Sequence, residues 1–264
     1  MRLAKHHARL SLSFTALAAD LDWIQAIQYY GGTLRKNDRT DEPKDYSLLY
    51  PLLDRVTTLD PRFNIAYRFG SIFLAEPNPG GAGRPDLAIA LLEKGIAATG
   101  RWEYYEDMGF VYYWQLHDYK AAAGAFQRGA RAPNGPWWLE TLAAVTLLRG
   151  GDRATSRSLW RQIQQTADND WLRHQAELRL TQLDAMDQMD QLEAIVTRYR
   201  LMNGHLPDSW LALERARLLR GNGPPLDPAG EPYQLDPESG RVTLSRSSRL
   251  RPLPTEPPGA AAQS

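Results

Sequence analysis

The chain has 264 residues, and its 31 lysines and arginines equal its 31 aspartates and glutamates. This length suits one elongated domain or two small ones and can bury a sizeable core. A balanced chain has no overall field to draw it to nucleic acid or to an anionic membrane. The sequence lacks cysteine, which excludes disulfides, thiolate zinc sites and a cysteine nucleophile.

The first 18 residues form a basic arm in which MRLAKHHAR precedes the mildly apolar stretch LSLSFTAL. A basic stretch, an apolar stretch and the small-residue run Ala16-Leu17-Ala18 are arranged as in a signal peptide. The apolar stretch is short and rich in serine and threonine, so we prefer an arm over 1–18 that leads into the first helix. No run approaches the roughly 20 apolar residues of a transmembrane helix.

From Ala19 to about Leu219, apolar residues recur three and four positions apart, as in amphipathic helices. Glycine and proline punctuate this pattern, for example at Gly31-Gly32, in PNPGGAGRP and in APNGP. The spacing predicts antiparallel helix pairs joined by short loops. Small residues such as Gly70 and Gly109 recur in the first helix of each pair, where we expect close helix approach.

Two segments resemble the second helix of the tetratricopeptide repeat. They are LLDRVTTLDP (Leu52 to Pro61) and LHDYKAAAGAFQRGARAP (Leu116 to Pro133). Consecutive units in register extend over 19–168 as roughly four pairs. The resemblance implies an all-α fold, a tetratricopeptide-like helical-hairpin solenoid, with C-terminal helices over 169–220. A long loop over 31–45 and an insertion over 77–85 depart from the family pattern.

The segment from Arg198 to Ser245 resembles the soluble part of type II secretion major pseudopilins, through Gly-His-Leu-Pro at 204–207 and DPAGEPY at 227–233. PYQL and RVTLS around DPESG predict a β-hairpin within 221–250. The chain lacks a prepilin cleavage motif and a long apolar assembly helix, so we do not expect it to polymerise. A convergent helix-turn-hairpin cap is an equal alternative. The Pro- and Ala-rich tail over 251–264 is expected to be disordered.

Motifs for catalysis and for cofactors are missing from the sequence. There is no H-E-x-x-H pair, serine nucleophile elbow or phosphate loop, so we expect a non-catalytic protein with no metal or cofactor. An acidic stripe recurs every three residues and is expected to be a solvated face; it comprises Asp184, Asp187, Asp190 and Glu193. Four tail arginines without interleaved aromatics offer weak attraction to phosphate or a membrane surface but predict no nucleic-acid binding; they are Arg241, Arg246, Arg249 and Arg251.

The first helices of a tetratricopeptide-like superhelix line its concave surface. We therefore expect the partner-binding side chains among first-helix residues that packing does not require. They are Asn64, Tyr67, Ser71, Glu103, Glu106, Phe110, Tyr113, Trp114, Trp138, Thr141 and Arg149. In an alternative interpretation, the amphipathic segment from Trp171 to Leu219 folds back and buries this groove.

These features predict a protein–protein interaction scaffold or adaptor that binds a peptide or helix of another protein. The pseudopilin-like segment suggests a bacterial envelope, secretion or pilus-type assembly, with the chain peripheral to a membrane complex. The compartment stays open between cytoplasm and periplasm. The alternative is a structural subunit of a fixed multiprotein complex that uses its convex face and C-terminal segment. An enzyme is a third interpretation, which predicts clustered ionisable groups that the sequence does not offer.

Overall fold

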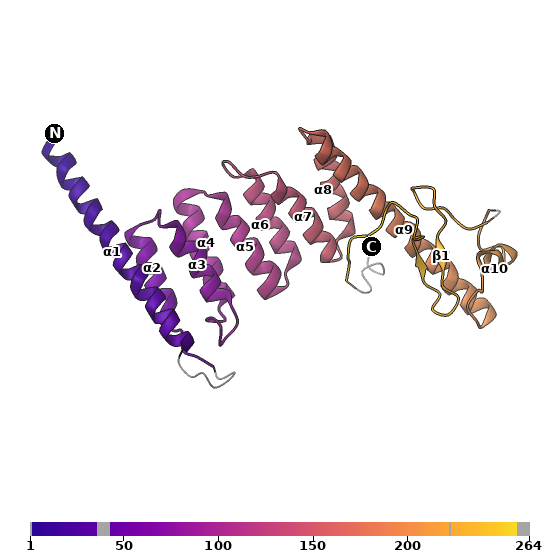
Figure 1. Ribbon diagram of the computed structural model, residues 1–264, viewed down its shortest axis with the longest axis horizontal. Coiled ribbons are helices and arrows are strands. Elements are labelled where there is room, and N and C mark those ends of the chain that lie inside the picture. The colour runs from indigo at the N-terminus through magenta and orange to yellow at the C-terminus, as the bar shows by residue number, and fades with distance from the viewer. Residues whose placement is uncertain (1, 36–42, 222, 258–264) are drawn as a thin grey trace. The chain divides into compact units, whose positions relative to one another are not determined.

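The structure is a computed structural model that describes residues 2–35, 43–221 and 223–257, with side chains from Phe14 onward (Figure 1). Most of the described residues are helical, which confirms the all-α class. The chain divides into an N-terminal unit that ends at Thr146 and a C-terminal unit that begins at Leu147. The sequence analysis placed the end of the repeats at 168 instead.

The helices of the N-terminal unit each pack against the next helix in the chain, most closely within the pairs α1–α2, α3–α4 and α5–α6. They are α1 (Arg2–Arg35), α2 (Leu49–Leu59), α3 (Asn64–Ala75), α4 (Pro85–Thr99), α5 (Trp102–Val111), the π-helical turn η1 (Tyr112–Leu116) and α6 (Tyr119–Arg131). Helix α7 (Trp138–Arg149) contains the boundary between the units.

Glycines allow the closest helix contacts in this unit. A Cβ added to Gly109 on α5 would lie 2.2 Å from Cε1 of Phe126 on α6. A Cβ on Gly70 of α3 would lie 2.9 Å from Cδ2 of Leu53 on α2. Both distances are shorter than van der Waals contact. At Gly109 a side chain would overlap the Phe126 ring, whereas at Gly70 the nearest atoms are the methyl ends of leucine side chains, which would have to shift. The expected role of these two glycines in close helix approach is confirmed.

The first helix is longer than expected. Gly31-Gly32 was expected to end the first helix, but both residues lie inside α1, which runs without interruption from Arg2 to Arg35. Tyr30 stacks on Phe73 of α3 with ring centroids 4.0 Å apart, so tertiary packing here outweighs the low helix propensity of glycine. Residues 2–18 of the expected arm belong to this helix, and residues 36–42 of the expected loop lie outside the described residues.

The C-terminal unit is built on α8 (Arg153–Thr166), α9 (Asp170–Asn203) and α10 (Trp210–Arg215). Helix α8 packs along α9, which is why it belongs to this unit. The predicted hairpin is present: β1 (Gln234–Leu235) pairs antiparallel with β2 (Val242–Thr243), in a register that places Leu235 opposite Val242. Tyr233, Val242 and Leu244 join Leu192 of α9 in one hydrophobic core.

The beginning of the tail is ordered against this core, which corrects the expectation of disorder over 251–257. Gln182 Nε2 of α9 donates hydrogen bonds to the carbonyl oxygens of Leu250 (2.8 Å) and Pro252 (3.0 Å). Leu253 packs on the core, and Glu256 binds Arg153. Residues 258–264 lie outside the described residues.

Three of the four acids in the stripe on α9 form ion pairs, which corrects the expectation of a free solvated face. Their side chains stay 34% to 59% exposed, and the fourth acid, Glu193, accepts a hydrogen bond from the N–H of Val242 (2.9 Å). The Arg153 side chain of α8 is only 6% exposed, and its Nη1 lies 2.6 Å from carboxylate oxygens of both Asp187 and Asp190. Arg157 Nη2 lies 3.1 Å from Asp184. Periodicity alone placed these acids on one face of α9, and the two arginines that cover this face come from a different helix.

Within the described part of the chain, no helix has the length and apolar content needed to cross a bilayer.

Candidate functional site

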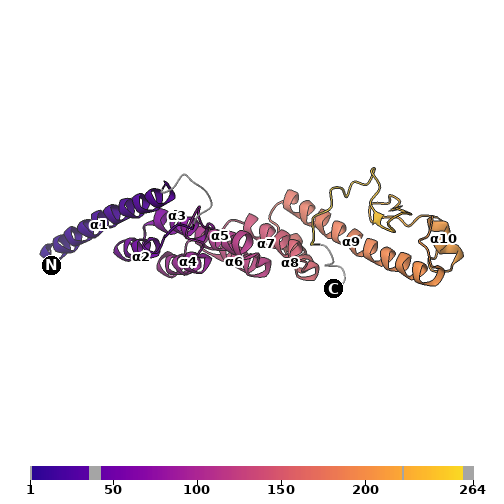
Figure 2. The same ribbon diagram turned by 90° about the horizontal axis from the view of Figure 1, so that it is seen from below.

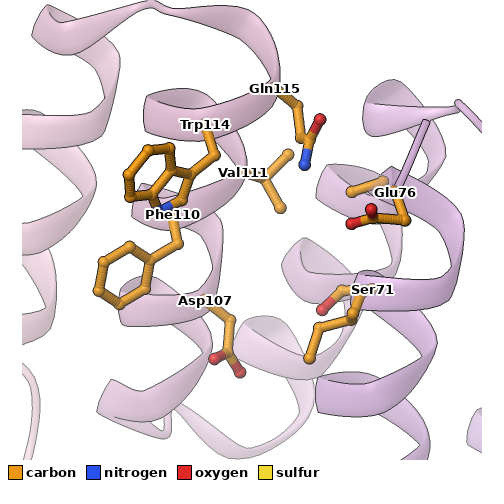
Figure 3. Close-up of a pocket in the computed structure, with 9 residues that line it drawn as sticks. Ser71, Glu76, Asp107, Phe110, Val111, Trp114 and Gln115 are labelled. Atoms are coloured by element: carbon orange, nitrogen blue, oxygen red, sulfur yellow. The ribbon is translucent and has the colours of Figure 1, made fainter.

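A cavity of about 300 Å³ lies between α3 and the α5–η1 segment in the N-terminal unit (Figure 3). Residues of α3 and the position after it form one wall, and residues of α5 and η1 form the other. The lining comprises Ser71, Ile72, Ala75, Glu76, Asp107, Phe110, Val111, Trp114 and Gln115. The cavity combines a largely apolar wall with acidic groups, an arrangement that suits an amphipathic ligand.

The apolar wall carries large side chains that are exposed to solvent, and its two aromatic rings pack against neighbouring rings. Trp114 is 60% exposed and Ile72 is 54% exposed. The Trp114 ring meets Tyr113 edge-on with centroids 4.8 Å apart, and Phe110 meets Phe126 edge-on at 5.3 Å. These contacts fix the orientation of the Trp114 and Phe110 rings while part of each ring stays exposed to a partner, as in the aromatic anchors of interfaces.

The acidic groups of the site share one arginine. Asp107 accepts hydrogen bonds from Arg68 Nε (2.7 Å) and Nη2 (2.9 Å), and Glu106 lies 3.5 Å from the same guanidinium. Glu76 faces the cavity from the α3 side (Figure 3) and has no cation within ion-pair distance among the described residues. Two carboxylates, Glu76 and Asp107, line the cavity, and the guanidinium that pairs with Asp107 is shared with Glu106 outside the lining. The cavity therefore has a negative potential that favours a cationic ligand.

Burial shifts the pKa of two carboxyls at the site, Asp107 and Glu106. Burial raises the pKa of Asp107 above its ordinary value, and the hydrogen bonds from Arg68 offset this only in part. Burial, and secondarily the charge of Asp107, raises the pKa of Glu106. The negative charges of both carboxylates are therefore only partly balanced in the free protein. A cation bound in the cavity would offset the free-energy cost of burying them.

A π-helical turn positions the aromatic end of the site. After Val111 the helix widens over Tyr112–Leu116, and the N–H of Asp118 donates to the Tyr112 carbonyl oxygen (3.0 Å). His117 closes the turn with φ of 51°. A π turn holds more residues than an α turn, so it rotates the following side chains relative to α-helical register. Figure 3 shows Trp114 and Gln115 on the cavity wall, above Asp107 and Phe110.

The predicted partner-binding residues divide between the cavity and the protein interior. Ser71, Phe110 and Trp114 line the cavity. Tyr113 packs edge-on against the Trp114 ring, and Glu106 adds a negative charge next to Asp107. Tyr67 requires a correction: its ring is fully buried against Tyr104, with centroids 5.1 Å apart, so it is a core residue that no partner can reach.

Other predicted residues lie away from the cavity. Glu103 is held by Arg101 at 2.5 Å. Trp138 packs edge-on against Trp102 at 5.9 Å, and Thr141 Oγ1 donates to the Trp138 carbonyl oxygen. Two further predicted residues do not line the cavity: Asn64, at the start of α3, is half-buried, and Arg149 belongs to the C-terminal unit.

Sequence reasoning missed six lining residues, namely Ile72, Ala75, Glu76, Asp107, Val111 and Gln115. A helical face at 107, 111 and 115 follows from four-residue spacing, and it could have been found by extending the predicted register one position.

No protein-family model, curated protein or solved structure matches the chain. Its function is therefore inferred from the geometry and chemistry of the cavity.

Proposed function

We propose that the protein is a non-catalytic interaction scaffold that holds a peptide or helix of another protein in the cavity between α3 and the α5–η1 segment. The observation that carries this proposal is the pairing of exposed, well-supported Trp114 and Phe110 with the under-compensated acids Glu76 and Asp107. Buried aromatic anchors supply most of the affinity of protein interfaces, and the acids add selectivity for positive charge.

A tetratricopeptide-like repeat is the proposed framework for this site. Support comes from successive helix pairs and from the seating of Phe126 on Gly109, the register that the repeat resemblance predicts. In the C-terminal unit, Asp227 Oδ1 accepts hydrogen bonds from the N–H groups of Ala229 (2.8 Å) and Glu231 (2.9 Å), which makes the DPAGEPY segment a defined turn. This turn is consistent with the pseudopilin-like interpretation and with a partner in an envelope or secretion-type assembly.

The ligand that fits the cavity is a segment with a large apolar side chain next to a lysine or arginine. The apolar side chain would lie against Ile72, Phe110 and Trp114, and the cation would reach Glu76 and Asp107 across the cavity (Figure 3). No group of the cavity needs to react for this, so a binding role accounts for all of its features.

Selection from a random peptide display library on the purified full-length chain tests the proposal. We expect enrichment of peptides that place an apolar residue beside lysine or arginine. Trp114→Ala should weaken the selected peptides by about 30-fold, the cost of a typical hot-spot truncation. Trp171→Ala removes an equally exposed tryptophan from the C-terminal unit and is the matched control. Peptides that bind Trp114→Ala as tightly as the parent chain would exclude the cavity as their site.

A structural subunit of a fixed multiprotein complex is the second candidate, and α1 favours it. Leu17, Leu21 and Ile24 are exposed on α1, while Ala19 and Ala26 of the same helix are buried. An uncovered apolar stripe is typical of a surface that another subunit covers. Light scattering on the purified chain tests this: association that Leu17→Ser/Leu21→Ser abolishes supports the candidate, and a parent chain that stays monomeric at high concentration contradicts it.

A further inference from the structure

The end of the C-terminal unit formed by the last turns of α9 and by α10 carries several exposed apolar side chains, among them Leu201, the most exposed large apolar side chain of the described residues. Leu201 is 82% exposed and Met202 is 62% exposed, and Leu211 of α10 is exposed as well. Both views place α10 beside the C-terminal end of α9 (Figures 1 and 2), and the two helices are in contact. Single exposed apolar residues are ordinary, but a group of them marks a binding surface.

Five arginines lie in the same stretch of chain as these apolar residues. All five are exposed, and none has an ion-pair partner among the residues that the structure describes; they are Arg198, Arg200, Arg215, Arg217 and Arg220. The same stretch, 198–220, contains two acids, Asp208 and Glu214. Glu214 Oε1 already accepts a hydrogen bond from the N–H of Gly223 (2.8 Å). The surface is therefore locally cationic although the whole chain is neutral.

This surface belongs to the folded core of the unit. Helix α9 ends at Asn203, and the following Gly204, with φ of 78°, turns the chain back toward α10. Leu206 then packs on Gly240, where an added Cβ would lie 2.8 Å from Leu206 Cδ2. Trp210 Nε1 donates to the carbonyl oxygen of Tyr233 (3.2 Å), which ties α10 to the hairpin. The exposed leucine and methionine are thus presented on a fixed support.

We propose that this α9–α10 end binds the surface of an anionic phospholipid bilayer. Leu201 and Met202 would enter the boundary between headgroups and acyl chains, and the arginines of the same stretch would pair with lipid phosphates. The apolar residues are aliphatic, which suits insertion into lipid, whereas single-stranded nucleic acid is bound on exposed aromatic rings. Two aromatic residues lie nearby, and both are half-buried. Tyr199 meets His205 edge-on at 5.7 Å, and Trp210 donates a hydrogen bond to Tyr233, so neither offers such a platform.

Vesicle co-sedimentation of the full chain tests this proposal. We expect binding to vesicles of equal parts phosphatidylcholine and phosphatidylserine, weaker binding at high salt, and little binding to phosphatidylcholine alone. Arg198→Glu/Arg220→Glu should lower partitioning onto the anionic vesicles by about 30-fold. Leu201→Ser/Met202→Ser should lower it by about 10-fold while the salt dependence persists.

Arg62→Glu/Lys120→Glu is the matched control, because it makes the same charge change at exposed positions of the N-terminal unit. It should bind vesicles like the parent chain, and thermal unfolding confirms that each variant is folded. Equal binding to both vesicle types, or a loss in the control equal to that in Arg198→Glu/Arg220→Glu, overturns the proposal. Binding of the parent chain to DNA but not to anionic vesicles assigns the surface to nucleic acid and also overturns it.

Discussion

The ring of Phe126 on α6 lies so close to Gly109 on α5 that a Cβ added to this glycine would lie 2.2 Å from the ring. Both residues are fully buried. The contact joins the helix that carries Phe110 and Asp107 to its partner, and Phe110 packs on the same Phe126 ring. The position of the cavity wall thus depends on one close helix crossing.

Gly109→Ala should destabilise the N-terminal unit by about 2 kcal/mol or more, because the new methyl group overlaps a buried ring that has no space to move. Gly124→Ala is the matched control on α6. A Cβ there meets nothing within 4 Å, so this change should stabilise the helix by about 0.5 to 1 kcal/mol. Urea unfolding monitored by circular dichroism measures both, and equal stability of the two variants would show that the crossing is looser than described.

Binding of a lysine-containing peptide in the cavity should weaken as the pH falls. Because burial raises the pKa values of Asp107 and Glu106 above 3.8 and 4.5, these groups lose their charge at a higher pH than ordinary carboxyls. The affinity should therefore decline before the pH reaches 4.5. Fluorescence titration at a series of pH values measures it. Glu106→Gln should flatten part of this dependence, and an affinity that rises on acidification would contradict the assignment of the acids.

Tyr67→Phe should protect the protein against alkaline unfolding. Burial raises the pKa of Tyr67 from 10.0 to about 12, against the effect of its hydrogen bond to Thr57. Between these pH values the unfolded chain loses the proton and the folded chain keeps it, so stability present below pH 10 is lost as the pH rises, by roughly 2 to 3 kcal/mol in total. Unfolding curves at pH 9 to 12 for Tyr67→Phe, with Tyr119→Phe as control, should show a smaller alkaline loss in the first variant alone.

Arg153→Met should destabilise the C-terminal unit by about 3 kcal/mol, because it leaves Glu256 and the acids of α9 without their shared cation. Arg161→Met changes an exposed arginine of the same helix and should be nearly neutral. Hydrogen exchange of the α8 and tail amides reports the effect locally. Unchanged hydrogen-exchange protection in Arg153→Met would mean that the contacts of Gln182 and Leu253 alone hold the segment from Leu250 to Glu256 on the core.

The amino-acid sequence by itself determined most of the helices and the close approach at Gly70 and Gly109, because helix periodicity, capping and glycine spacing are local properties, but it did not predict the unbroken helix through Gly31-Gly32. Asp118 and Asp152, for instance, cap α6 and α8 through hydrogen bonds from residues three positions on. It also located Phe110 and Trp114. Only the tertiary structure decided that Tyr67 faces the core, that a π turn carries Trp114 to the cavity, and that Arg153 binds Glu256 across 103 residues of chain. These outcomes depend on which elements meet in space, and a periodic pattern holds no information about the partner on the other side of a contact.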